Sequence, residues 1–214
     1  VIDALELLNK YSTDAVRYSL LRCSTVEDSD YDEETLITRN NNELADKLGN
    51  LVSRVSTLAE KYGLEKAEQV KELESKTLAK SVSEHLENFQ FDKALNEIFT
   101  FIDKCNTYVQ ETSPWITKDK KVLYRLVNAI KDASILLSPF IPETCEKIAK
   151  TFNFKIDLKE LDKPIKVSKI KKADILFTKI EIDVNNDKTK NNKQNEPSRI
   201  LDNNLKSVNN KAIV

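Results

Sequence analysis

The chain has 214 residues, of which 40% are hydrophobic and 32% charged, and it contains only two glycines and five prolines. A β-sandwich, a β-barrel or a glycine-rich phosphate loop needs many tight turns, so this composition argues against all three and favours a mostly helical protein. With 34 basic and 35 acidic side chains, the chain is not a general polycation that would bind any nucleic acid.

Cysteine and histidine are scarce. Cys23, Cys105 and Cys145 are far apart and form no CxxC pair, which indicates free thiols in a reducing, intracellular setting. His85 is the only histidine, so histidine-based metal sites and Ser-His-Asp catalysis are not expected. No apolar run approaches the roughly 18 residues of a membrane span. The chain begins with Val1 and has no methionine, and we therefore expect it to be a piece of a longer protein or a trimmed product.

The first predicted elements are two short helices, over residues 3–10 and 13–24, followed by an acidic segment over 25–32 that is an extended loop or a short edge strand. Thr13 and Asp14 stand where the second helix needs its N-terminal cap.

A long helix of about 28 residues follows. Asp30 and Glu33 have the spacing of a capping box at its start, and Gly63 ends it. Apolar residues recur at alternating steps of four and three along one face, which are Leu44, Leu48, Leu51, Val55 and Leu58.

The middle of the chain continues with helical periodicity. Apolar stripes cover 78–89, 91–105 and 122–137, a short helix is predicted over 142–152, and residues 113–119 form a junction. Several amphipathic helices joined by short loops predict an all-α antiparallel helix bundle. Beyond residue 153 we expect an extended arm over 154–182 that packs on the bundle through Ile175, Leu176, Phe177 and Ile180, and then a flexible Asn- and Lys-rich tail over 183–214.

Sequence signatures of catalysis are missing. No GxGxxG, Walker loop, HExxH or ExxH pair occurs, so we predict no catalytic residue and no metal ligand in this chain. Asn50 and Arg54 are four residues apart, which stacks them on one helix face about 6 Å apart at Cβ. An amide beside a guanidinium suits the edges of nucleic-acid bases. An Asn and Arg pair can also lie on a helix surface in solvent with no binding role, and both interpretations stay open.

The single tryptophan, Trp115, follows a stiff helix start in which Ser113 is a predicted N-cap and Pro114 the first helical residue. Polar neighbours suggest an exposed or half-exposed ring, which is what stacking on an unpaired base requires. A lone tryptophan can equally be a core residue.

Five segments resemble the methionyl-tRNA synthetase family within class I. The first, VIDALELLNKYSTDAVRYSLLR, resembles the segment that follows the KMSKS catalytic loop. Three more resemble the family's anticodon-binding domain, and they read NNNELADKLGNLVSR, ETSPW and LLSPFIPETCEKI. The last, ADILFTKIE, resembles the closing segment on that domain, so the match covers residues 1–182.

This resemblance implies a stem-contact region over 1–30 and a helical anticodon-binding bundle over 31–153. It implies that Asn50 and Arg54 hydrogen-bond anticodon bases, that Trp115 stacks on the first anticodon base, and that Pro114 sets the position of the ring. The anticodon would be CAU. Possible phosphate contacts in this interpretation are Lys118, Lys120 and Lys121.

The resemblance also implies the partners: the anticodon loop of tRNA(Met) and the catalytic domain of the same cytoplasmic enzyme, with no DNA and no membrane. No cofactor is expected in this chain, because ATP, and zinc where that insertion exists, would bind in the catalytic part. We therefore expect the chain by itself to be inactive as a ligase. Two alternatives remain, a helical protein-interaction scaffold and the anticodon-binding domain of another class I synthetase.

Overall fold

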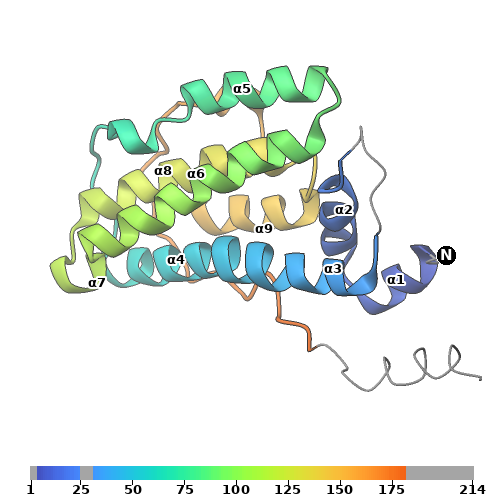
Figure 1. Cartoon of the computed structure of the whole chain (residues 1–214). Coiled ribbons are helices and arrows are strands. Elements are labelled where there is room, and N and C mark those ends of the chain that lie inside the picture. Colours follow the sequence, from blue (N-terminus) through green and yellow to red (C-terminus); the bar gives the residue numbers. More distant parts are fainter. Residues whose placement is uncertain (1–3, 25–30, 182–214) are drawn as a thin grey trace, which may run out of the picture. The chain divides into compact units, whose positions relative to one another are not determined.

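The computed structural model describes residues 4–24 and 31–181, which lie in one unit spanning Val1–Glu181 (Figure 1). Residues 25–30 of the acidic segment predicted at 25–32, and the tail predicted at 183–214, are outside the described residues. Within these ranges the chain is helical and has no strand, which confirms the predicted all-α class. The α-helices are α1 (Ala4–Lys10), α2 (Thr13–Leu21), α3 (Glu33–Arg39), α4 (Asn50–Tyr62), α5 (Lys76–Glu87), α6 (Phe91–Thr112), α7 (Pro114–Thr117), α8 (Lys120–Leu137) and α9 (Pro142–Phe152).

The predicted long helix is three segments in line, because a π-helical stretch, η1 (Asn40–Gly49), joins α3 to α4. Its start differs from the predicted capping box, since the Asp32 carboxylate accepts the Thr35 N–H at 2.7 Å. Gly49 is the last residue of η1. A Cβ atom at this position would lie only 3.2 Å from the carbonyl oxygen of Leu44. The helix still ends at Gly63, as predicted.

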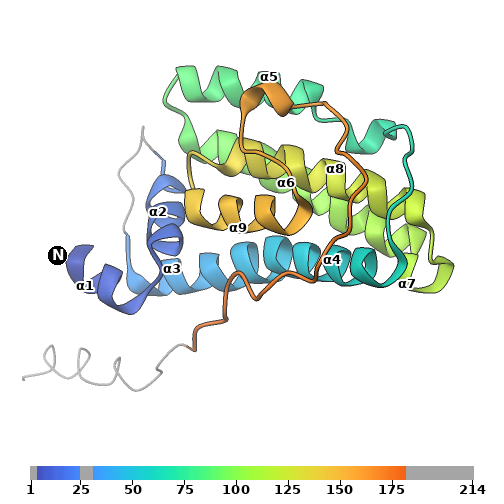
Figure 2. The same ribbon diagram turned by 180° about the vertical axis from the view of Figure 1, so that it is seen from behind.

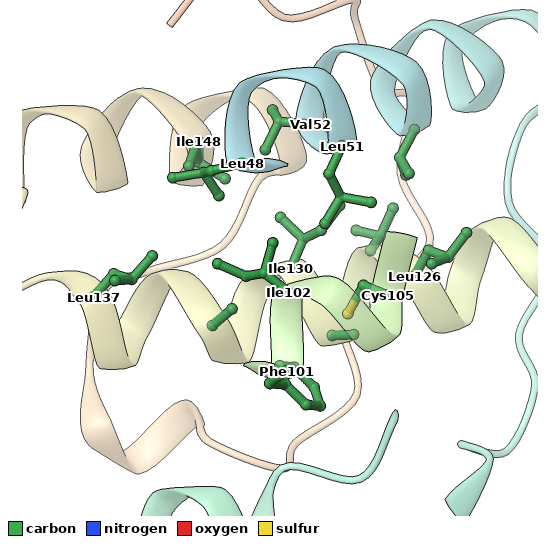
Figure 3. Close-up of a cluster of buried hydrophobic side chains, with 14 of the residues drawn as sticks. Leu48, Leu51, Val52, Phe101, Ile102, Cys105, Leu126, Ile130, Leu137 and Ile148 are labelled. Carbon is green, nitrogen blue, oxygen red and sulfur yellow. The ribbon is translucent and has the colours of Figure 1, made fainter. Parts of the chain in front are cut away.

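The core lies where α4, α6, α8 and α9 meet (Figures 2 and 3). Side chains from all four helices or from η1 converge there with at most 4% of their surface exposed, and they include Leu48, Leu51, Val52, Phe101, Ile102, Leu126, Ile130, Leu137 and Ile148. Cys105 and Cys145 are fully buried in this core, and burial raises the pKa of both thiols. Cys105 and Cys145 thus fill core positions, whereas Cys23 is only half-buried.

The N-terminal helices attach to the bundle through α2. The cap predicted at Thr13 and Asp14 is wrong, because the Ser12 hydroxyl caps α2. The buried Asp14 carboxylate instead accepts the Thr144 N–H at 2.6 Å and so caps the start of α9. Arg17 donates to the backbone carbonyl oxygens at the α8–α9 corner, at 2.8 and 3.2 Å. Polar side chains therefore fix α2 against a corner of the bundle.

Residues 154–181 form an arm that runs back along the bundle and is extended except for a short 3-10 helix, η3 (Leu158–Glu160) (Figure 2). The apolar side chains that it buries are Ile165, Ile170 and Ala173, while Leu176 and Phe177 are partly buried against the core. The prediction for Ile175 is wrong, because 80% of that residue is exposed.

Side chains of α4 and α8 bond backbone groups of the arm. The Tyr124 hydroxyl donates to the carbonyl oxygen of Ile165 at 2.9 Å, and the N–H of the same residue donates to Asn128 Oδ1 at 2.9 Å. Further along, the N–H of Ala173 donates to the buried Ser56 hydroxyl at 3.0 Å. These bonds compensate the backbone polar groups that the arm buries.

None of the described helices combines the length and apolar character needed to cross a membrane.

Replacing Tyr124 with phenylalanine tests how the arm is held. Tyr124 is 1% exposed, so the variant leaves the carbonyl oxygen of Ile165 without its buried donor. We expect the free energy of unfolding to fall by about 1–3 kcal/mol in urea titrations. Tyr62→Phe is the matched control, because Tyr62 is half-buried and its hydroxyl bonds no described residue, and we expect a change below about 0.5 kcal/mol. Equal effects of the two variants would contradict this account of the arm.

Candidate nucleic-acid interface

Asn50 and Arg54 lie on the outer flank of α4. Leu51 and Val55, the residues that follow each of them, have at most 1% of their surface exposed and face the core. Asn50 is exposed and Arg54 is half-buried, as the helical spacing predicts for a pair beside an apolar stripe. The stripe therefore fixes the direction in which both polar side chains leave the helix.

Trp115 lies on α7, a single turn between two left-handed residues, Ser113 with φ 43° and Lys118 with φ 53°. Non-glycine residues adopt this conformation rarely, so the turn is closely constrained at both ends. Pro114 is the first helical residue, as predicted, and is buried. Ser113 occupies the N-cap position, but its hydroxyl caps nothing and donates to the carbonyl oxygen of Gln110 at 2.9 Å. Trp115 is 40% exposed.

The Asn50–Arg54 pair and Trp115 border the same surface hollow. Trp115 lies in α7, which is beside the C-terminal part of α4 at one end of the bundle (Figures 1 and 2). Between them is a hollow of about 510 Å³, which we call the α4–α7 hollow, and it is lined by Asn50, Ser53, Arg54, Thr57, Leu58 and Trp115. Side chains more than sixty positions apart in the sequence thus share one surface depression.

The α4–α7 hollow offers apolar surface and hydrogen-bonding groups together. No described residue accepts a hydrogen bond from the Arg54 guanidinium, so its donors are available to a ligand. Asn50 Nδ2 donates to Asp46 Oδ1 at a long 3.4 Å. A half-exposed indole beside an amide and an unpaired guanidinium can stack on a planar base and bond its edge.

Three lining residues were not among the predicted site residues. Ser53, Thr57 and Leu58 follow Asn50 at three, seven and eight positions, which is the repeat of one helix face, so the periodicity could have identified them. The Thr57 hydroxyl is already bonded to the carbonyl oxygen of Ser53 at 2.7 Å. Leu58 was assigned to the buried stripe, but it is half-buried and lines the hollow.

The predicted phosphate-binding lysines lie nearby in sequence but do not line the hollow. Lys118, Lys120 and Lys121 are exposed at the junction of α7 and α8. Lys121 pairs with Glu65 at 3.4 Å, with both side chains more than half exposed, so solvent weakens that pair.

A second hollow, of about 580 Å³, is lined by residues 66–69, 73–76 and 162–164 and by side chains of α8. Polar groups that line it bond one another: the buried Ser75 Oγ lies 2.7 Å from Oδ2 of the buried Asp132 and 2.6 Å from Oδ1 of the exposed Asp162. Burial raises the pKa of the Asp132 carboxyl. His85 has a local role as well, since its Nδ1 lies 2.9 Å from Gln90 Oε1. Over the described ranges, no cluster of three or more His, Cys, Asp and Glu side chains could hold a metal ion.

Comparisons with known proteins agree with the predicted resemblance. The class I tRNA synthetase model labelled M matches residues 1–56. Methionine–tRNA ligases from Caldanaerobacter subterraneus subsp. tengcongensis and Clostridium perfringens are 34% and 35% identical over 207 and 205 residues. In both comparisons 86% of this chain is aligned, and it spans only 32% of the relative.

The fold has a solved counterpart in apo methionyl-tRNA synthetase of Mycobacterium tuberculosis, with a TM-score of 0.79 and 21% identity. That alignment covers 85% of this chain and 41% of the synthetase. The family model described as the anticodon-binding domain of tRNA ligase matches residues 70–202, which is more than half of the chain. The chain therefore belongs to the anticodon-binding domain family of the tRNA ligases.

Proposed function

We propose that this chain is the anticodon-recognition module of a methionyl-tRNA synthetase and reads the CAU anticodon of tRNA(Met). The observation that supports the proposal most directly is the α4–α7 hollow, where Asn50, Arg54 and Trp115 lie together. The names of the relatives favour methionine as the amino acid of the complete enzyme, since the two curated relatives above are methionine–tRNA ligases.

Recognition in this proposal takes place on bases that leave the stack of the anticodon loop. The first anticodon base stacks on the Trp115 ring, while Asn50 and Arg54 hydrogen-bond base edges. Pro114, buried at the first position of α7, restricts the backbone that carries the ring. Lys118, Lys120 and Lys121 are the proposed phosphate contacts, and their exposure is compatible with that role.

The chemistry belongs to the rest of the enzyme in this proposal. Methionine and ATP give a bound adenylate and pyrophosphate, and the methionyl group then passes to the 3′ end of the tRNA with release of AMP. The partners of this chain are the tRNA(Met) anticodon loop and the catalytic domain, which would bind ATP and any zinc. We propose the cytoplasm as the place of action.

Trp115→Ala tests the stacking role. Removal of a base-stacking aromatic side chain typically costs about 1–3 kcal/mol of binding. We therefore expect the affinity for a CAU anticodon stem-loop to fall roughly 5- to 150-fold in a fluorescence-anisotropy titration. The free energy of unfolding should change little, because the ring is 40% exposed.

Ile116→Ala is the matched control for this variant. Ile116 is the next residue of α7, is 71% exposed and does not line the α4–α7 hollow. Its truncation should leave binding unchanged. The stacking role is refuted if Trp115→Ala unfolds the domain while the affinity of the folded fraction stays at the wild-type value.

Arg54→Ala should affect specificity as well as affinity. Its guanidinium has donors that no described residue uses, so a base edge is the acceptor that the proposal assigns to it. A specific base contact of this kind contributes about 1–3 kcal/mol of discrimination. We expect the affinity ratio between CAU and a mismatched anticodon to narrow. An equal loss for matched and mismatched stem-loops would instead assign Arg54 to phosphate.

The purified chain should show no methionine-dependent ATP–pyrophosphate exchange. The reason is the absence of any catalytic signature in its 214 residues. Radiolabelled pyrophosphate incorporation into ATP measures this directly, with a complete methionyl-tRNA synthetase as the positive control. Exchange above the level of a no-enzyme blank would contradict the assignment of the chemistry to other residues.

A further inference from the structure

Asp46 lies one helical turn before Asn50 and uses its two carboxylate oxygens on different partners. Oδ1 accepts the Nδ2 group of Asn50 at 3.4 Å, and Oδ2 accepts the Lys179 ammonium at 2.8 Å. Lys179 comes from the arm, 133 positions away in the sequence. One carboxylate therefore connects the arm to a residue that lines the α4–α7 hollow.

The arm reaches Asp46 in a fixed register because the asparagines of η1 bond its backbone. Asn40 Nδ2 donates to the carbonyl oxygen of Thr178 at 2.9 Å. Asn41 bonds both backbone groups of Ile180, accepting its N–H at 2.9 Å and donating to its carbonyl oxygen at 2.8 Å. Lys179 lies between these two anchored residues, so its side chain is held near Asp46.

A carboxylate can only accept hydrogen bonds, and this determines how the Asn50 amide is turned. The NH₂ end of the amide faces Asp46, and the opposite orientation would bring two acceptor oxygens together. Asn50 Oδ1 is then the group left for a ligand in the α4–α7 hollow. Lys179 offsets the negative charge of Asp46, which would otherwise repel a phosphate backbone beside the site.

We propose that Asp46, held by Lys179, is a positioning residue that orients the Asn50 amide so that Oδ1 accepts a hydrogen bond from an exocyclic amine of cytosine or adenine. This inference rests on the proposed function and adds to it the direction of one hydrogen bond. A base with a keto oxygen at the same place presents an acceptor to an acceptor and is disfavoured.

The test measures affinity ratios on the full chain with three anticodon stem-loops, CAU, UAU and CGU. The second replaces the cytosine amine with a keto oxygen, and the third does the same to adenine. We expect the wild type to disfavour at least one of the two, and Asn50→Ala to remove that preference. Each ratio compares two RNAs on one protein sample. Partial unfolding of a variant therefore lowers both apparent affinities equally and leaves their ratio unchanged.

Asp46→Asn is the decisive variant, because an amide at position 46 can donate as well as accept and no longer selects one orientation of Asn50. We expect the affinity ratio between CAU and the disfavoured stem-loop to fall about 3- to 10-fold, which is the contribution of one hydrogen bond. Asp46→Glu keeps an acceptor on the same face and should retain most of the preference. Lys179→Met should shift the ratio in the same direction as Asp46→Asn, by a smaller factor.

Asp103→Asn is the matched control, since Asp103 pairs with Lys47 at 2.7 Å and is about as exposed as Asp46, but does not contact Asn50. If Asp46→Asn shows the same affinity ratio between stem-loops as Asp103→Asn, while Asn50→Ala loses the preference, the positioning role is overturned and the proposed function stands. If the wild type shows no preference among the three stem-loops, both are overturned.

Discussion

The rotation of α4 about its own axis is fixed by the burial of its inner face, and the candidate interface depends on it. Leu51, Val52 and Val55 have at most 1% of their surface exposed, in the core that α4 forms with α6, α8 and α9. Figure 3 shows Leu51 and Val52 in this core. Each buried side chain of this kind is worth about 1.5–3 kcal/mol. Turning the helix would expose all three, at a cost above that of any contact on the outer flank. Asn50 and Arg54 are therefore directed outward by residues that never touch a ligand.

The second half of the interface depends on backbone conformation instead. A single turn of helix has few internal hydrogen bonds and is unstable alone, because helix formation is cooperative. Here α7 is held between two longer helices, α6 and α8, with left-handed residues at both ends and a buried proline at its start. This explains how a half-exposed indole can keep one position on so short an element. The rigidity that the proposed stacking requires comes from the junction rather than from burial of the ring.

The arm adds a third constraint, because side chains of three separate elements of the bundle bond its backbone. Tyr124 and Asn128 bond it on α8, Ser56 bonds it on α4, and Asn41 bonds it on η1. The π-helical η1 is central here, since its asparagines, poor helix formers, bond the arm through their side chains. A local departure from α-helical geometry thus coincides with the place where the arm meets the long helix.

The sequence by itself determined most of the helices, because apolar periodicity records which face of a segment is buried. It also determined that Asn50 and Arg54 share a face beside the stripe and that Trp115 follows a stiff, proline-started turn. The corrections share a cause. Asp14 is a residue type that often caps its own helix, but it caps α9 instead. Ile175 is a residue type that is often buried in a core, but it is exposed.

Only the tertiary structure decided that α4 and α7 border one hollow, that Leu58 lines it, and that Asp46 connects Asn50 to Lys179. Periodicity describes each segment relative to its own axis and carries no information on which distant segment lies against it. Those contacts arise from the packing of the whole bundle.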